Sequence, residues 1–392
     1  MTAPVSKSYL PLLITAFASG TALGLFVAKR MMKLSPEQHL WCIVMHSFTG
    51  ALIHAGDSLE LYDHLEAMKR PVTAQEFAEA TGWSERWLQE FLAQAAGAGI
   101  CTFRDGKFSM TPGYAPLLCN PATNPRSLAG LFEMLLPLVK RAESVVVRAI
   151  QSGKGVDYDF SNAQIIRGID RKNYNWFRDY LVKDVLKDVN VPATGEPLVE
   201  MLERGVHVAD IGCGCGASSI TLAKAFPKST IHAYEASALS LQVLEERIHA
   251  ENIPNIVVCN VAERGVGDGP DGDASEFSFV YSHDLLHDMT DPQSLIRDVK
   301  TKLSPRGCWI VVDIKCQNTV TANIQSPASA LFYGFSCLLC LACSTSEDHG
   351  AGLGTCGLPA TKCQEFMKEA GFTHCEERGV ASNPVQARYI VA

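Results

Sequence analysis

The chain has 392 residues, of which 47% are hydrophobic, and it carries a net charge of −8. A chain of this length and apolar content can bury a large core and is expected to form two domains. The negative balance argues against a phosphate-binding surface, so no nucleic-acid partner is expected. The fourteen cysteines are scattered and two of them interrupt a glycine run, which favours a reducing compartment over a disulfide-bonded secreted fold.

The first feature in chain order is an uncharged apolar stretch at 9–28, which Lys29, Arg30 and Lys33 follow. As a helix it would span about 30 Å, the thickness of a bilayer's hydrocarbon core. The positive charge after the stretch favours a cytosolic position for the rest of the chain. A hydrophobic anchor helix with a basic flank is therefore expected within 1–35. A cleaved signal peptide and a helix packed on the folded domain are the alternatives.

The middle of the chain is expected to be helical before strands begin. Residues 39–54 have the pattern of an apolar helix that could pack against its copy in a homodimer, and residues 119–195 that of mostly helical connectors. From about residue 196 strand and helix patterns alternate, which predicts a doubly wound, mainly parallel, Rossmann-like sheet. The expected strands lie near 206–211, 230–235, 256–259, 277–282, 308–313 and 386–391.

The most informative motif is VADIGCGCG at 208–216, in which a buried strand stops in a loop of three closely spaced glycines. Gly212, Gly214 and Gly216 allow a tight turn and close approach of the backbone to a ligand. A helix over 217–225 would direct its N-terminal N–H groups at the same ligand. Glu235, at the end of the next strand, can accept hydrogen bonds from a ribose diol, so a nucleoside ligand is expected.

The loop alone fits either a nicotinamide cofactor or S-adenosylmethionine, since Gly212, Gly214 and Ala217 also satisfy the dinucleotide pattern. Asp210 favours S-adenosylmethionine, because a carboxylate at that place can reach a cationic amino acid group but would repel a pyrophosphate. A NAD-dependent Rossmann oxidoreductase stays open as an alternative.

Two downstream segments, FSFVYSHDLLHDMTDP at 277–292 and LSPRGCWIVVDI at 303–314, resemble the later motifs of class I S-adenosylmethionine-dependent methyltransferases. The LHDMTD portion is similar to the LHDWxD segment of plant and fungal small-molecule O-methyltransferases. Residues 59–118 are similar to the winged-helix domain that precedes the catalytic domain in that superfamily. PLVEMLERGVHVADIGCGCG and HGAGLGTCG at 349–357 resemble most closely an uncharacterised branch with bacterial and invertebrate members.

The resemblance implies an enzyme that transfers a methyl group from S-adenosylmethionine to a small-molecule acceptor, with a hydroxyl as the expected nucleophile. Beside the anchor it implies a winged-helix domain of the dimerisation type at 36–118, a helical connector at 119–195 and the methyltransferase domain at 196–392. With the anchor, the enzyme is expected to be held at a membrane with its catalytic domain facing the cytosol. A non-catalytic adenosyl-binding scaffold at a membrane remains a second alternative.

His287 is the candidate general base, because imidazole titrates near neutral pH and because the residue matches the catalytic histidine of the plant motif. Asp284, beside it, could contact the methionine end of the cofactor or the acceptor. Asn260 stands where the family usually carries an acidic residue that meets the adenine amino group, and its amide oxygen can still accept that bond. The expected cofactor-binding residues are Asp210, Gly212, Gly214, Gly216, Glu235, Asn260, His283 and Asp284.

The segment 324–348 is expected to form a lid over the substrate. Cys337, Cys340 and Cys343 within it have a spacing that suggests a metal or cluster. Their surroundings are apolar with a helical period and no fourth ligand with zinc-like spacing accompanies them, so no metal site is expected.

Three further expectations concern residues near the candidate base and the acceptor. Asp288 and Asp291 are expected to cap the turn that follows them, because TDP at 290–292 is typical of a helix start. His349 is an alternative base. The acceptor site is expected to be lined by aromatic side chains, which suit a flat apolar molecule. They are Tyr158, Trp176, Phe177, Phe332 and Tyr333.

Overall fold

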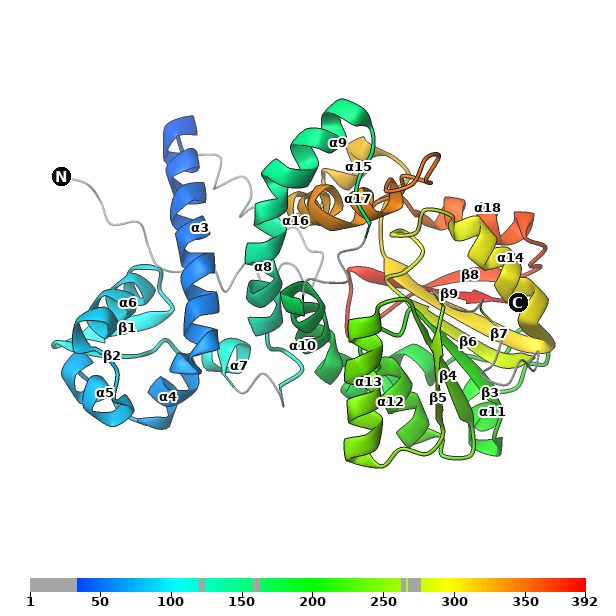
Figure 1. The fold of residues 1–392 in the computed structure, drawn as a ribbon, viewed down its shortest axis with the longest axis horizontal. Coiled ribbons are helices and arrows are strands. Elements are labelled where there is room, and N and C mark those ends of the chain that lie inside the picture. Colours follow the sequence, from blue (N-terminus) through cyan, green and yellow to red (C-terminus); the bar gives the residue numbers. More distant parts are fainter. Residues whose placement is uncertain (1–33, 120–123, 158–162, 262–265, 267–275) are drawn as a thin grey trace. The chain divides into compact units, whose positions relative to one another are not determined.

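The computed structural model describes residues 34–119, 124–157, 163–261, 266 and 276–392. The chain forms two compact units (Figure 1). One unit comprises the residues up to Leu136 together with Arg167–Asn175, and the other comprises Pro137–Ile166 together with Trp176–Ala392. Helices α8 (Ala129–Arg141) and α10 (Ala163–Tyr180) therefore each contribute residues to both units.

In its described residues the first unit is helical apart from one hairpin, and the first described element is the long helix α3 (Pro36–Ser58). A capping box begins this helix: the Ser35 hydroxyl accepts a hydrogen bond from Gln38 N–H, and the Gln38 side chain accepts one from Ser35 N–H. The capping box and Pro36 at the first helical position let the helix begin before residue 39, so that it extends beyond the expected 39–54. Further elements are α4 (Leu61–Ala67), α5 (Ala74–Thr81), α6 (Glu85–Gly97), β1 (Cys101–Arg104), β2 (Lys107–Met110) and α7 (Ala115–Leu118).

The apolar residues of the first unit are distributed unevenly between a core and one exposed helix surface. Helices α4 to α6 and the antiparallel β1–β2 hairpin enclose the core, in which Phe77 and Leu92 are fully buried. Helix α3 instead presents large apolar side chains to solvent along its first half. We call this set the α3 face: Leu40, Trp41, Ile43, Val44, Met45 and Phe48.

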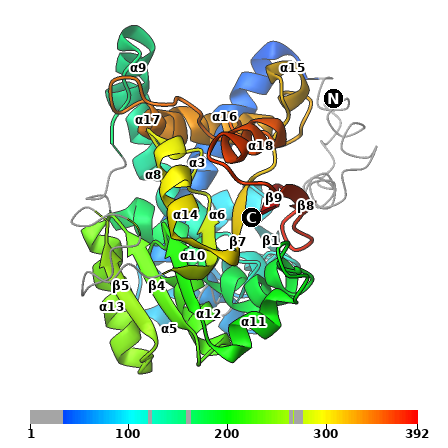
Figure 2. The same cartoon turned by 90° about the vertical axis from the view of Figure 1, so that its right-hand side faces the viewer.

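The second unit is built on a seven-stranded sheet with the order β5-β4-β3-β6-β7-β9-β8. Figure 2 labels five of these strands, β5, β4, β7, β9 and β8. The five strands β5, β4, β3, β6 and β7 run parallel, whereas β9 is antiparallel to β7 and β8 is antiparallel to β9. The expected α/β fold with a mainly parallel sheet is confirmed. The strands are β3 (His207–Ile211), β4 (Thr230–Glu235), β5 (Ile256–Asn260), β6 (Phe277–His283), β7 (Leu303–Ile314), β8 (Cys375–Gly379) and β9 (Gln386–Val391).

Helices cover both faces of this sheet, as the alternation of side chains along β3 shows. Ala209 packs in one apolar cluster with Ile296 of α14 and Met367 of α18. The next residue, Asp210, points to the other face, where Ser219 of α12 donates a hydrogen bond to it. The helices of this unit and its π-helical turns are η1 (Ala142–Val146), α9 (Val147–Ser152), η2 (Leu181–Leu186), α11 (Leu198–Arg204), α12 (Ala217–Ala225), α13 (Ala238–Glu251), α14 (Pro292–Lys302), α15 (Val320–Asn323), α16 (Ser329–Phe335), η3 (Ser336–Cys340), α17 (Leu341–Ser344) and α18 (Ala360–Glu369).

Two details of the sheet were not predicted. Strand β8 has the sequence CEERG, which offers no apolar alternation, and it pairs only with β9 at the edge of the sheet. Strand β7 begins at Leu303 rather than near 308, because Leu303 pairs with Phe277 across a register shift. Both features depend on pairing with a neighbouring strand and not on the local pattern.

Among the residues that the structure describes, no helix combines the length and apolarity that a membrane crossing needs. The expected anchor at 9–28 lies outside the described residues, which begin at Leu34.

Candidate active site

The glycine loop joins β3 to α12 and is attached to the neighbouring strand β4. Gly212, Gly214 and Gly216 all adopt positive φ angles, of 71°, 55° and 81°, which favour glycine. Gly212 N–H donates to the Tyr234 carbonyl at 2.8 Å. A Cβ added to Gly216 would collide with the Leu244 side chain, whereas one added to Gly214 would meet no atom within 4 Å. Open space thus lies over Gly214, where a ligand can approach the backbone.

Glu235, at the end of β4, holds the loop from the side. One carboxylate oxygen accepts the Gly214 N–H at 2.8 Å, and the other accepts the N–H groups of Ala236 and Ser237 at 2.7 and 2.9 Å. A carboxylate offers about four lone-pair sites, and these N–H groups occupy three of them, so one remains for a hydroxyl of a ribose diol. Asn260 lies opposite Glu235 in the register of β4 and β5, which brings these two expected cofactor residues to the same edge of the sheet.

Asp210 lies beneath the loop and is 1% exposed. Its Oδ2 atom accepts hydrogen bonds from the Ser218 and Ser219 hydroxyls, at 2.6 and 2.5 Å. Burial raises the pKa of Asp210 to about 6, although both hydroxyls act in the opposite direction by stabilising the carboxylate. The negative charge of Asp210 is therefore sensitive to pH just below neutrality.

His283 and Asp284 end β6, the strand beside β3. Tyr281 and Gln386 contact the two ring nitrogens of His283, the Tyr281 oxygen lying 2.8 Å from Nδ1 and the Gln386 amide nitrogen 2.7 Å from Nε2. The same amide nitrogen donates to Asp284 Oδ1 at 2.9 Å. The Leu285 side chain then passes over the glycine loop, since a Cβ on Gly212 would lie 3.0 Å from it. The turn after β6 and the loop after β3 therefore meet.

His287, on that turn, is 3% exposed and pairs with a carboxylate that the sequence analysis did not include. Its Nδ1 atom lies 2.5 Å from Oδ1 of Asp313, a fully buried residue near the end of β7. Asp313 Oδ1 also accepts the Ile314 N–H at 2.7 Å, which fixes its position. With Nδ1–H donated to Asp313, a neutral His287 keeps its lone pair on Nε2.

The charge state of His287 differs from the sequence expectation. Burial alone would lower its pKa, but the carboxylates of Asp313 and Asp288 favour the imidazolium and raise the pKa well above the ordinary value. The prediction that an ordinary imidazole pKa suits neutral pH is therefore wrong for this residue. His287 is a stronger base than a free histidine, and its unprotonated fraction increases with pH.

Asp288 and Cys340 lie on the Nε2 side of His287. The Asp288 carboxylate is 3.2 Å from Nε2. Cys340 comes from η3, and the ligand atoms of His287, Asp288 and Cys340 lie within 4.8 Å of one another. The expected capping role of Asp288 is wrong, because Asp291 alone of the two accepts from the first turn of α14, through Ser294 N–H at 2.9 Å.

Comparisons with known proteins bear on the same part of the chain. The family described as "Methyltransferase domain" matches residues 209–309, which contain the glycine loop, Glu235 and His287. The chain contains a methyltransferase domain. Since this family uses S-adenosylmethionine, the expected enzyme class and methyl donor are confirmed, and neither alternative has support. No curated protein matches the chain.

Solved structures show that the likeness in fold extends beyond the matched domain. An O-methyltransferase family protein from Burkholderia thailandensis has 16% identity and a TM-score of 0.65, with 91% of this chain and 98% of that chain covered. Mitomycin 7-O-methyltransferase has 16% identity and a TM-score of 0.64, with 93% and 98% covered. Human N-acetylserotonin methyltransferase, determined with SAM, has 14% identity and a TM-score of 0.60, with 91% and 98% covered.

The aromatic residues expected at the acceptor site of the methyltransferase domain lie in different surroundings. Trp176 and Phe177 are buried and contact the His283 ring edge-on, with centroids 5.4 and 4.8 Å away. Phe332 and Tyr333, on α16, are half-buried. Tyr158 lies outside the described residues. His349 is exposed in the loop after α17, in contrast to the buried His287.

The expected lid segment of the domain is helical in its middle, and the loop behind it contacts the His287 turn. Helices α16 and α17 and the turn η3 lie within 324–348. In the following HGAGLGTCG segment, Gly354 N–H donates to the His287 carbonyl at 3.1 Å. This hydrogen bond places that glycine-rich loop beside the candidate base.

Asp313 and Gln386 are site residues that the sequence analysis missed, and Cys340, which it considered only together with Cys337 and Cys343, was not expected beside His287. A signal existed for Asp313, because a polar residue that ends a buried strand next to β6 must lie near the His287 turn. Cys340 and Gln386 return to the site from distant parts of the chain, and no local pattern indicates that return.

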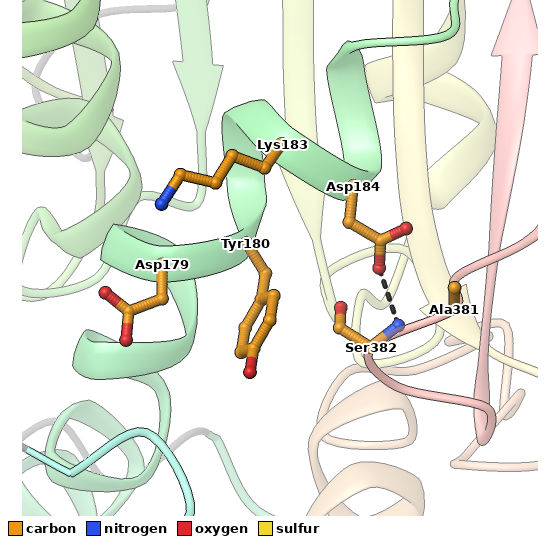
Figure 3. A pocket seen from close by; sticks show the side chains of 6 residues that line it. All are labelled: Asp179, Tyr180, Lys183, Asp184, Ala381 and Ser382. Atoms are coloured by element: carbon orange, nitrogen blue, oxygen red, sulfur yellow. Dashed lines mark hydrogen bonds between the residues drawn. The ribbon is translucent and has the colours of Figure 1, made fainter.

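A separate hollow of the second unit holds none of the expected site residues. It is lined by Asp179, Tyr180, Lys183, Asp184, Ala381 and Ser382 (Figure 3). Asp184 accepts a hydrogen bond from Ser382 N–H across it at 2.6 Å, which joins η2 to the loop after β8.

Proposed function

We propose that the protein transfers a methyl group from S-adenosylmethionine to a hydroxyl of a small-molecule acceptor, with His287 as general base. The observation that carries this proposal is the buried His287–Asp313 pair, held on the turn whose Leu285 packs over the glycine loop. A base for a hydroxyl must lie beside the methyl donor, and these contacts support that placement.

The donor supplies an electrophilic methyl on a sulfonium, and its sulfur leaves as a neutral thioether. His287 Nε2 takes the hydroxyl proton as the new O–C bond forms. Asp313 then faces an imidazolium across a 2.5 Å hydrogen bond and stabilises the charge that develops. The proton later passes from Nε2 to solvent, which returns the base to its starting form.

We assign the donor to the edge formed by the carboxyl ends of β3, β4 and β5. In this assignment the backbone of Gly212, Gly214 and Gly216 approaches the donor, Glu235 binds the ribose diol and Asn260 accepts from the adenine amino group. The open space over Gly214 supports it. Asp210, His283 and Asp284 are assigned to the methionine end, where Asp210 would attract the ammonium group from beneath the loop.

The acceptor is assigned to the side of His287 that faces α16 and η3, with a flat apolar ring as the chemical class. An untargeted comparison of metabolites, incubated with the enzyme and isotopically labelled methyl donor, tests the proposal. Wild type should produce a labelled ether, and His287→Ala should produce it about 10²–10⁴-fold more slowly. Both proteins should bind the donor equally. Equal turnover by both proteins would contradict the base assignment.

The first unit is assigned a dimerisation role as a winged-helix domain. The order of α4, α5 and α6 before the β1–β2 hairpin supports the domain type. The α3 face supports the role, because its six large apolar side chains are 42–66% exposed on a helix whose start is fixed by a capping box. Sedimentation should show a dimer for wild type and a monomer for Phe48→Glu. Trp87→Glu, at a residue 78% exposed on α6, is the matched control and should remain a dimer.

We also retain the N-terminal anchor as a proposal. The uncharged stretch at 9–28 and the basic residues that follow it support a helix that spans a bilayer with the catalytic domain on the cytosolic side.

A further inference from the structure

The side of His287 that faces away from Asp313 presents three different ligand types. A ring nitrogen of His287, an Asp288 carboxylate oxygen and the Cys340 sulfur lie within 4.8 Å of one another, and the nitrogen 3.2 Å from the Asp288 oxygen is Nε2. His287 and Cys340 are buried, at 3% and 6% exposure. These residues come from the turn after β6 and from η3, so the fold itself brings them together.

Nitrogen, oxygen and sulfur donors in this combination suit zinc. Zinc binds imidazole nitrogen and carboxylate oxygen at about 2.0–2.2 Å and thiolate sulfur at about 2.3 Å. Ligand atoms around one ion are then roughly 3–4 Å apart. Side-chain rotations that move the three ligand atoms by about 1 Å would bring them to these separations. Three protein ligands leave one position of a tetrahedral ion open.

Two independent observations point to a cation at this place. Asp313 holds the Nδ1 side of His287 at 2.5 Å, and a carboxylate behind the imidazole is the usual partner of a metal-bound histidine. On the opposite side, the buried Asp288 Oδ1 lies 3.2 Å from His287 Nε2, and the Cys340 side chain also interacts with the Asp288 carboxylate. Once Nε2 and the thiol lose their protons, a bound cation would take the place of those protons between the three groups.

We propose that His287, Asp288 and Cys340 bind a zinc ion, with Asp313 as the supporting carboxylate. Binding replaces the thiol proton of Cys340 and any proton on Nε2, and both protons leave to solvent. The Nε2 lone pair that holds the ion is the one that removes the acceptor proton. Zinc therefore competes with base catalysis and switches the enzyme off. This inhibition rests on the proposed function, but the binding of zinc does not.

Cobalt(II) serves as the spectroscopic probe, because it takes tetrahedral sites like those of zinc and gives a thiolate charge-transfer band. Wild-type protein should bind one cobalt ion with such a band, and zinc should displace it. Cys340→Ala should lose the band. Cys343→Ala, at a buried cysteine of the adjoining α17 outside the cluster, is the matched control and should keep it. Asp313→Asn should keep the band but weaken zinc binding by about 10–100-fold.

The binding proposal is overturned if wild type shows no such band, or if Cys343→Ala loses it to the same extent as Cys340→Ala. The inhibition is measured separately, as the ratio of turnover with and without added zinc. That ratio should fall at least tenfold for wild type, recover with a chelator and stay near one for Cys340→Ala. A protein that binds cobalt as described but methylates no acceptor would contradict the proposed function and leave the metal site in place.

Discussion

The hydrogen bond between His287 and Asp313 leads to a quantitative prediction for Asp313→Asn. Asp313 Oδ1 receives two donors, His287 Nδ1–H and Ile314 N–H, at 2.5 and 2.7 Å. Asp313 Oδ2 is buried and has no hydrogen-bond partner in the described part of the chain. An asparagine will therefore place its amide oxygen at the Oδ1 position and its nitrogen at the Oδ2 position. The imidazole keeps its tautomer and the negative charge is removed, while two amide N–H donors enter the buried Oδ2 position.

The magnitude of the effect follows from that single lost charge. A hydrogen bond to a charged group contributes about 1.5–3 kcal/mol and a neutral one about 0.5–1.5 kcal/mol, so, comparing low end with low end and high end with high end, the imidazolium formed during methyl transfer loses roughly 1–1.5 kcal/mol. At about 1.36 kcal/mol per factor of ten, kcat should fall about 5- to 13-fold. The free enzyme changes too. Because Asp313 raises the pKa of His287, its loss should move the rising limb of kcat/KM to lower pH.

The assay is the pH profile of kcat/KM for wild type and Asp313→Asn, with the acceptor found by the labelling experiment. Asp291→Asn, which keeps the cap of α14, is the control for an Asp→Asn change nearby and should leave the profile unchanged. Calorimetric affinity for the donor and the Tm should be recorded for each protein. A rising limb at the wild-type pH in Asp313→Asn would refute the argument that Asp313 sets the charge state of His287.

Three further predictions concern the donor loop and the N-terminus. Gly214→Ala should bind S-adenosylmethionine at least about tenfold more weakly, since its Cβ enters open space, and its φ of 55° should cost some stability. Gly216→Ala, with a positive φ as well, should lower the Tm further through its clash with Leu244. Equal donor affinity for wild type and Gly214→Ala in calorimetry would remove the loop assignment. Affinity for the donor should be constant above about pH 6 and fall up to about tenfold for each pH unit below it. The reason is that Asp210, with a pKa of about 6, becomes protonated and loses the charge that attracts the ammonium group. The same decline in Asp210→Asn would exclude this cause. The full-length protein should resist extraction from membranes by alkaline carbonate, whereas a chain beginning at Leu34 should be soluble and active. An uncleaved full-length protein in the soluble fraction would exclude the anchor at 9–28.

The parts of the site that could be predicted are those whose chemistry lies within a few consecutive residues. Strand β3, the glycines after it and helix α12 follow one another without interruption, and the structure has α12 at the expected 217–225. His287 follows β6 in the same direct way. The positions of these residues at one edge of the sheet then follow from parallel pairing, which the alternation of strand and helix already indicated.

The environment of His287 could not be predicted in the same way, because it depends on which distant segments return to the site. Its partner Asp313 is 26 positions later and becomes a neighbour only through the pairing of β6 with β7. Cys340 had the appearance of a core residue in an apolar helical segment, and it is buried as such a residue should be. The metal-site proposal depends on where that buried sulfur points, a property that no one-dimensional pattern contains.

Gln386, on the last strand, has a consequence for which histidine can act as a base. Its amide nitrogen lies between His283 Nε2 and Asp284 Oδ1, and the carboxylate fixes the orientation of the amide because the amide oxygen would be repelled there. His283 must therefore accept at Nε2 and carry its proton on Nδ1, beside Tyr281. His283 and His287 thus share a tautomer, but the lone pair of His283 is already occupied. Gln386, although it is close to the C-terminus, thus prevents His283 from acting as a base. Of these two histidines, His287 is the one that can take a proton from an acceptor.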